Sequence, residues 1–291
     1  MAVEQSQSAR PRLSMRIPEF FKDPVTVFAC CIVFAFFFLG FFGEYLAPYK
    51  ITMLDMAHRF ASPSAAHWFG TDNLGRDTFS RVLAGTRVAL TVSILAIGAS
   101  VSCGIVLGLL AGYGPRWLDN LLMLLLDSIY SFPYIMLALA AITLFGSSQF
   151  IVVLVVAITT MPTYARLIRT STLSVRNHEY ILAARSMNIG HLQIVLRHIL
   201  PNVIGPVFIL VSMDIPVVIT VEAALSFLGL GVPPPAPSWG RMLNDGYTLI
   251  RQTPWLVIAG GIPLMLTTLG FTLLGEKLRD VLDPKLQVRR A

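Results

Sequence analysis

The segment VALTVSILAIGASVSCGIVLGLLAGYGP, residues 88–115, runs for 28 residues without Asp, Glu, Lys, Arg or His. A helix needs about 20 residues to cross the hydrocarbon layer of a bilayer, so this segment is long enough to span a membrane. The whole chain agrees, because 55% of its 291 residues are hydrophobic and only 13% are charged. Soluble proteins carry about 25% charged residues, and a soluble core could not use several such runs in so short a chain.

Five more spans are predicted by the same test. The charge-free run 128–165 is too long for one crossing, and the turn signal Phe-Gly-Ser-Ser-Gln at 145–149 divides it into two helices. The expected spans are 24–43, 88–115, 128–145, 149–165, about 203–228, and 254–275. The predicted fold class is an all-α integral membrane protein with six transmembrane helices, without an internal repeat or a second soluble domain.

The first apolar run is too long for the core of a signal peptide, and residues 44–48 offer no convincing cleavage site, so we expect it to remain as a membrane helix. The three cysteines lie in the first two expected spans and form neither a disulfide framework nor a zinc framework. The five histidines fall on both sides of the expected membrane, so no metal site is predicted.

The distribution of Lys and Arg predicts the orientation, because basic residues are enriched on the cytoplasmic side. With the N-terminus inside, 15 of the 22 basic residues are cytoplasmic and seven are external. Both termini are therefore expected in the cytoplasm. The net charge of +6 follows from this sidedness, and the basic residues form no cluster with interleaved aromatics that would indicate a nucleic-acid partner.

This orientation predicts the organisation of the chain. A cytoplasmic tail (1–23) precedes the first helix (24–46), and an external amphipathic segment (47–86) follows it. The core (87–275) contains a cytoplasmic loop (176–202) and an external loop (230–253), and a cytoplasmic tail (276–291) closes the chain.

The cytoplasmic loop contains the polar stretch EYILAARSMNIGHLQIVLRHILPN, residues 179–202. Tyr180, Ala183, Ala184 and Met187 recur there at helical spacing, so both alanines are expected on one face that another backbone can approach closely. The Asn-Ile-Gly at 188–190 interrupts this pattern, and a second short helix is expected with Leu192, Val195, Leu196 and Ile199 on one side, ended by Pro201, with Asn202 capping the next helix. A helix lying on lipid would carry large apolar residues opposite basic ones. Two adjacent alanines beside an acidic residue favour a helix that fits a groove on a cytoplasmic partner.

The same stretch resembles the EAA loop of ABC-importer permeases, a coupling helix that enters a groove on the ATPase subunit. Ala183 and Ala184 match the alanines of that pattern, and Leu200-Pro201 match its end. Leu182 replaces the family's glutamate, and Asn188 occupies the position of its glycine, where a left-handed turn suits Asn almost as well. The resemblance implies ATPase-coupling roles for Glu179, Tyr180, Ala183, Ala184, Arg185, Asn188, Gly190, His198, Leu200 and Pro201.

Three further stretches resemble the second permease subunit of dipeptide and oligopeptide importers: HWFGTDNLGRDTFSRVLAGTRVAL (67–90), ALSFLGLGVPPPAPSWGRMLNDG (224–246) and LRDVLDPKL (278–286). This resemblance implies a permease of the bacterial inner membrane that pairs with a homologous permease, two ATP-binding subunits and an external substrate-binding protein. Nickel complexes, opines and sugars are alternative cargoes of the same branch.

The chain lacks G-x-x-x-x-G-K-[ST], the loop that cradles phosphates, so ATP and Mg are expected on the separate ATPase and no enzyme activity is expected here. A secondary transporter would carry inverted repeats or matching broken helices, and neither is apparent. A membrane scaffold that does not transport is a further alternative.

Ionisable residues inside spans usually face a cavity or another helix. Asp127, Asp214 and Glu222 interrupt apolar stretches, and either a polar lining of the cargo route or helix–helix contacts would explain them. Asp77 is spaced to pair with Arg81 at i, i+4. Trp239 follows a proline run that acts as a spacer, and these three residues are candidates for contact with the delivering protein.

Overall fold

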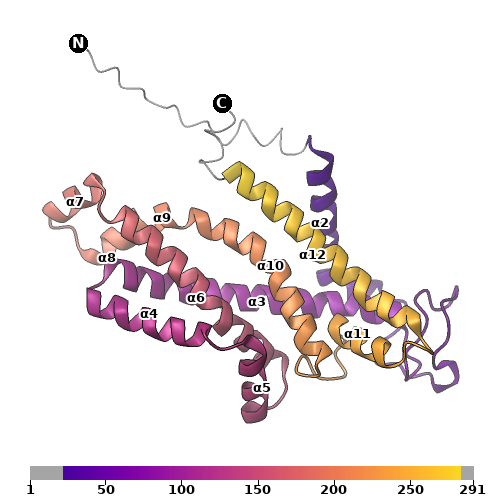
Figure 1. The fold of residues 1–291 in the computed structure, drawn as a ribbon. Coiled ribbons are helices and arrows are strands. Elements are labelled where there is room, and N and C mark those ends of the chain that lie inside the picture. The colour runs from indigo at the N-terminus through magenta and orange to yellow at the C-terminus, as the bar shows by residue number, and fades with distance from the viewer. Residues whose placement is uncertain (1–21, 283–291) are drawn as a thin grey trace.

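The computed structural model describes residues 22–282 and is built from helices (Figure 1). Five helices are long and apolar enough to cross a membrane. They are α2 (Pro24–Leu46), α3 (Thr78–Tyr113), α6 (Gln149–Val175), α10 (Gly205–Phe227) and α12 (Pro254–Leu282). The bent pair α4 (Arg116–Tyr130) and α5 (Tyr134–Phe145) counts as a sixth span if the two are taken together. The expected all-α membrane fold is confirmed.

The prediction of one continuous helix over 128–145 is wrong. The helix α4 begins at Arg116, and the chain turns by 86° before α5 begins at Tyr134. Pro133 precedes α5, lacks a backbone N–H, and disfavours helical geometry at Phe132. The start of α4 lies outside the predicted span because Asp119 is charged. In the structure, both carboxylate oxygens of Asp119 accept hydrogen bonds from Arg169 of α6, at 2.5 and 2.7 Å.

The second span begins ten residues before the expected Val88, at Thr78. The external segment predicted over 47–86 therefore ends at Asp77, whose carboxylate caps α3 by accepting a hydrogen bond from the Ser80 N–H at 2.8 Å. Two arginines made the first turns of α3 look too polar for a membrane helix. Arg81 is nevertheless buried, and the Asp72 carboxylate, 3.6 Å from its Nε, offsets part of the cost of burying its charge.

The centre of the fold is the parallel pair α3 and α6. Gly104, Gly108 and Gly112 recur every fourth residue on α3 and face Tyr164, Ile168 and Thr172 of α6 in the same order. Small residues at this spacing let two membrane helices approach closely. This helix contact was not predicted from the sequence, although the small-xxx-small spacing of the three glycines indicates it.

The remaining long helices alternate in direction around this pair. Gly40 and Gly43 of α2 pack against Leu90 and Leu83 of α3, so α2 runs antiparallel to α3. Gly270 of α12 packs against Ile32 of α2. Near the start of α2 and the end of α12, Lys277 Nζ lies 2.6 Å from the Asp23 carboxylate. The hydrogen bond from Lys277 holds the pKa of Asp23 below its usual range. The N-terminal end of α2 therefore lies beside the C-terminal end of α12.

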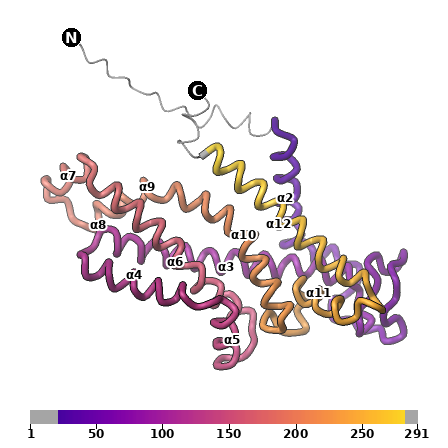
Figure 2. The backbone as a smooth tube through the Cα atoms, in the orientation of Figure 1, coloured from indigo at the N-terminus to yellow at the C-terminus, as the bar shows by residue number. Residues whose placement is uncertain are grey.

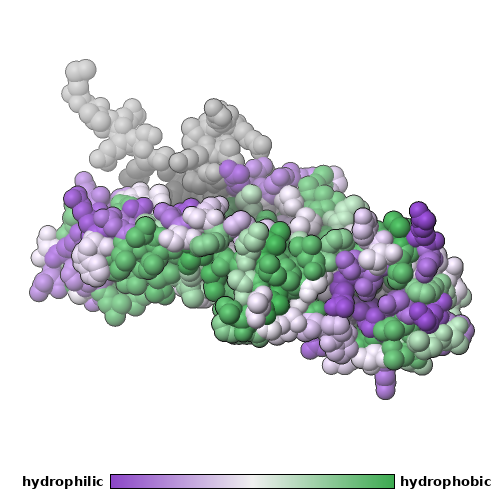
Figure 3. All heavy atoms as spheres, turned by 60° about the horizontal axis from the view of Figure 1, so that its bottom comes forward, coloured by the Kyte–Doolittle hydropathy of each residue, from purple (hydrophilic) through white to green (hydrophobic). Residues whose placement is uncertain are grey.

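Apart from α4 and α5, the shorter elements gather at opposite ends of the molecule (Figure 2). We call the end with α7 (Glu179–Ser186) and α8 (His191–Ile194) the loop end. The segment end contains residues 47–77, with the short helix η2 (Met56–His58), and α11 (Trp239–Thr248). Between the two ends, exposed hydrophobic side chains cover much of the surface (Figure 3), as a membrane environment requires.

Candidate functional site

The polar loop, residues 176–202, is anchored in the main hydrophobic core. After α8 the chain makes a π-helical turn (Val195–Ile199) and a last short helix, α9 (Leu200–Val203). Ile181, Ile194 and Ile199 have no exposed surface and pack into the same core as residues of α3 and α6. The loop is thus a rigid extension of the bundle.

The two alanines of the Glu-Ala-Ala-like pattern differ in burial. Ala184 is 3% exposed and packs in the core beside Ile181, whereas Ala183 is exposed. The prediction that both alanines share an outward face is therefore wrong, because Ile181 already commits that side of α7 to the bundle. The outward face of α7 consists of Tyr180, Leu182, Ala183 and Met187.

The second expected apolar face is divided in the same way. Leu192 and Leu196 are 72% and 53% exposed, whereas Ile199 is buried. We use "docking face" for the exposed apolar residues of the polar loop: Tyr180, Leu182, Ala183, Met187, Leu192 and Leu196. Exposed apolar surface of this kind is typical of sites that contact another protein or a membrane. Glu179, Arg185 and Gly190 are exposed around it.

Asn188 closes α7 with a left-handed backbone conformation, φ 57°. Its N–H donates to the Arg185 carbonyl at 2.9 Å, and the Ile189 N–H donates to the Ala184 carbonyl at 3.2 Å. These are the two hydrogen bonds of a Schellman motif, which satisfies the last carbonyls of a helix. Asn at the family's glycine position therefore keeps the turn.

Substitutions at Asn188 should separate backbone geometry from side-chain contacts. If the loop couples an ATPase to uptake, as the resemblance implies, Asn188→Gly should leave ATP-coupled uptake near the parental level, because glycine adopts this conformation without steric cost. Asn188→Val should impair uptake, since a left-handed conformation costs an ordinary L-residue roughly 1–2 kcal/mol and a β-branched one more. The measurement is uptake together with stimulation of the ATPase by loaded binding protein. Parental uptake by the Val variant would show that the turn geometry does not matter for coupling.

The end of the polar loop differs from the prediction. Pro201 does not end a helix but lies in the first turn of α9. The π-helical turn comes just before it, and the Leu200 N–H donates to the Val195 carbonyl, five residues back. Proline cannot donate a hydrogen bond and clashes with the carbonyl four residues earlier, so a widened turn accommodates it. Asn202 does not cap α10, because it lies within α9 and the N-cap of α10 is Ile204. Its Nδ2 donates to the His198 carbonyl at 2.6 Å.

Contacts at the loop end connect the polar loop to α3. The Tyr113 hydroxyl lies 2.9 Å from His191 Nδ1, and the Arg185 guanidinium lies 5.0 Å from the centre of the Tyr113 ring. Arg176 Nη1 donates to the Gly112 carbonyl at 2.8 Å. These contacts join α7 and α8 directly to the C-terminal end of α3.

The three acids within the helices have different surroundings. Glu222 is 2% exposed and accepts hydrogen bonds from the Ser226 and Ser238 hydroxyls at 2.7 and 2.9 Å. It ties α10 to the chain preceding α11, which is a structural contact. Asp127 accepts from Arg166 Nη2 at 2.8 Å across α4 and α6. Asp214 is partly buried beside Tyr164, whose hydroxyl has no hydrogen-bond partner within the described residues.

The three candidates for contact with the delivering protein are buried at the segment end. Asp77, Arg81 and Trp239 are 5%, 3% and 2% exposed. The expected Asp77–Arg81 pair is wrong, because Asp77 holds Ser80 and His67 Nδ1 (2.9 Å) while Arg81 pairs with Asp72. Trp239 Nε1 donates to the Val82 carbonyl at 3.1 Å. Together they fasten α11 and segment 47–77 to the beginning of α3 and present little surface.

Comparison with known proteins identifies this arrangement. Residues 104–288, which include the polar loop, match the family described as the inner membrane component of binding-protein-dependent transport systems. The chain belongs to this family. The permease is thus a multi-pass membrane component of a transport system and not an enzyme.

Curated relatives match the permease along most of its length. It is 37% identical over 266 residues to the dipeptide transport system permease protein DppC of Alkalihalophilus pseudofirmus, covering 91% of this chain and 88% of the relative. It is 42% identical over 269 residues to the glutathione transport system permease protein GsiD of Pectobacterium atrosepticum, covering 92% and 89%.

A solved structure shows the same fold. A chain of the MetNI methionine ABC transporter, in an inward-facing conformation, superposes with a TM-score of 0.57 at 16% identity. The match covers 69% of the permease and 96% of that chain.

Proposed function

We propose that the permease forms half of the translocation pathway of an ATP-driven importer for small peptides, dipeptides or glutathione-type peptides. The cargo class rests on the DppC and GsiD relatives, which align over nine-tenths of the chain. The observation that carries the coupling role is the docking face: exposed apolar residues on a loop whose other side is locked into the bundle core.

The partners follow from this proposal. Two ATP-binding subunits bind ATP and Mg, and one of them receives the docking face in a groove. A homologous permease completes the pathway, and an external binding protein delivers the cargo at the segment end. Closure of the ATPases pushes on α7, and the contacts of Tyr113 with His191 and Arg185 pass that displacement to α3.

The test is transport by the reconstituted complex in vesicles, with the binding protein supplied on one side. We expect accumulation of dialanine or glutathione only with ATP, and none when the ATPase subunits are omitted. Uptake without ATP would indicate a secondary transporter, and partner binding without any uptake would indicate a scaffold. Uptake of a nickel complex or a sugar in place of either peptide would move the cargo to another class.

Cysteine labelling checks the orientation. The native Cys30, Cys31 and Cys103 are replaced first, and single cysteines are then placed at Ser62, Ala236 and Asn188. A membrane-impermeant reagent should label positions 62 and 236 in intact cells, and position 188 only after permeabilisation, because both termini and the polar loop lie in the cytoplasm. Labelling of position 188 from outside would reverse the orientation.

A further inference from the structure

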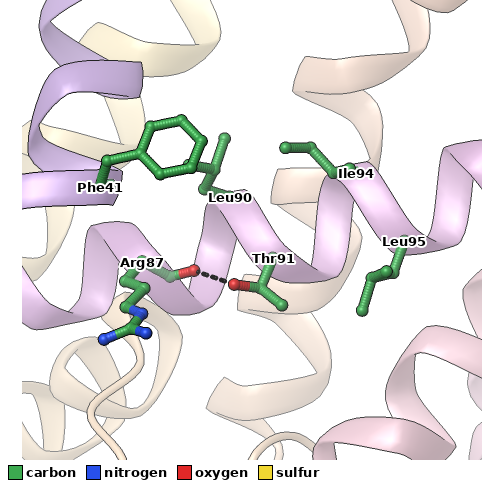
Figure 4. A pocket seen from close by; sticks show the side chains of 7 residues that line it. Phe41, Arg87, Leu90, Thr91, Ile94 and Leu95 are labelled. Carbon is green, nitrogen blue, oxygen red and sulfur yellow. Dashed lines mark hydrogen bonds between the residues drawn. The ribbon is translucent and has the colours of Figure 1, made fainter.

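A groove of about 280 Å³ lies between α2 and α3 towards the segment end. Its α3 wall repeats at helical spacing on one face of the helix, and Figure 4 shows these side chains in succession with Phe41 of α2 beside them. The lining residues are Gly40, Phe41, Arg87, Leu90, Thr91, Ile94 and Leu95. None of them belongs to the docking face or to the buried contacts around Asp77.

Arg87 places one end of this groove at the border between hydrocarbon and water. It is the last charged residue before the charge-free run 88–115. Tyr45 and Phe42, near the end of α2, are 86% and 52% exposed, and exposed aromatic rings are typical of membrane interfaces. From Arg87 to Leu95 the groove follows about 12 Å of helix. This is close to the hydrocarbon thickness of one leaflet, about half of 30 Å.

The polar end of the groove offers both signs of charge. Arg87 Nη1 donates to Glu44 Oε2, and the two side chains are 56% and 40% exposed. Within residues 22–282, the Nε and Nη2 groups of Arg87 and the Oε1 atom of Glu44 take part in no hydrogen bond. A solvated ion pair is held only weakly. The remaining donors of Arg87 and the remaining acceptor of Glu44 therefore suit a ligand that carries both an anionic and a cationic group.

Below this pair the groove is apolar. Thr91 is the one hydroxyl along it, and its Oγ1 already donates to the Arg87 carbonyl at 2.7 Å. Phe41, Ile94 and Leu95 are 61%, 49% and 53% exposed, so the groove opens sideways from the helices. An occupant must enter from the lipid and must itself be amphiphilic.

We propose that this groove binds a zwitterionic phospholipid of the phosphatidylethanolamine type. The phosphate accepts charge-assisted hydrogen bonds from Arg87, as guanidinium and phosphate groups do readily. The primary ammonium donates to Glu44, and one acyl chain lies along Leu90, Ile94 and Leu95. A choline headgroup has no N–H to donate, and an anionic glycerol headgroup would bring a net negative charge beside the Glu44 carboxylate without an ammonium to offset it.

The experiment is native mass spectrometry of the complete purified transporter, titrated with three lipids of identical acyl chains. Phosphatidylethanolamine should bind about tenfold more tightly than phosphatidylcholine or phosphatidylglycerol, a difference of roughly 1.4 kcal/mol. Arg87→Gln should lower binding of phosphatidylethanolamine by a similar factor. Glu44→Gln should abolish the preference over phosphatidylglycerol. The matched control Arg251→Gln, an exposed arginine outside the groove, should bind as the parent does.

Leu95→Trp tests the acyl chain while leaving both charges in place. Leu95 is exposed, so the indole should fill the deep end of the groove without disturbing the core, and all three lipids should bind more weakly. Equal binding of the three lipids by the parent would overturn the recognition of the headgroup. Parental binding by both Arg87→Gln and Leu95→Trp would overturn the site, and so would displacement of the lipid by inorganic phosphate alone. These outcomes do not depend on transport, so they are independent of the proposed function.

Discussion

Gly108→Leu in α3 should prevent the permease from accumulating as a folded protein. A Cβ at this position would lie 2.5 Å from the Ala165 carbonyl oxygen and 2.7 Å from Ile168 Cβ. The first contact is with backbone of α6, so it cannot be relieved by a change of rotamer. Overpacking of this kind costs about 3 kcal/mol, which is a large part of the stability of a typical domain.

The same helix supplies the control for this prediction. Nothing lies within 4 Å of a Cβ added at Gly98, so Gly98→Leu should leave the protein folded. The measurement is the yield of monodisperse protein in detergent and its thermal unfolding temperature, with both variants expressed side by side. Equal yields and unfolding temperatures for the two variants would show that close approach of α3 to α6 is not needed for folding.

The positions of most spans were predictable because hydrophobicity is a local property of the sequence. The run 88–115 fixes most of α3 without reference to any other residue. Predictions failed where a charge is neutralised by a partner far along the chain. Arg169 lies 50 residues from Asp119, and no local pattern reveals that this pair allows α4 to begin at Arg116. The early start of α3 was hidden in the same way by Arg81.

The candidate site was likewise predictable only in part. Asn188 and the helix–turn–helix pattern could be recognised from the chemistry of turns, which depends on neighbouring residues. Which of the two alanines is buried could not be predicted, because it depends on which side of α7 meets the core. The same limit applies to Trp239 and Arg81, whose burial results from contacts between α11, α3 and segment 47–77.

Ala183→Trp should release the ATPase from an intact permease. Ala183 lies on the outward face of α7, so a large side chain meets solvent in the permease alone and the fold should persist. In the complex the indole would occupy the space that Ala183 leaves for the wall of the groove on the ATPase. We expect at least a tenfold loss of ATPase binding, equivalent to about 1.4 kcal/mol, measured by co-purification and by titration of the ATPase onto the detergent-solubilised permease.

Two further variants make this prediction specific to the outward face. Ala183→Ser changes the volume little and should bind the ATPase as the parent does. Ala184→Trp should act by another route, because Ala184 is 3% exposed and an indole there must displace core residues around Ile181. Its thermal unfolding temperature should fall, whereas that of Ala183→Trp should not. If Ala183→Trp still co-purifies fully with the ATPase, the docking face is not the contact surface. If Ala184→Trp instead releases the ATPase at an unchanged unfolding temperature, the inward alanine is part of that surface and α7 must turn on binding.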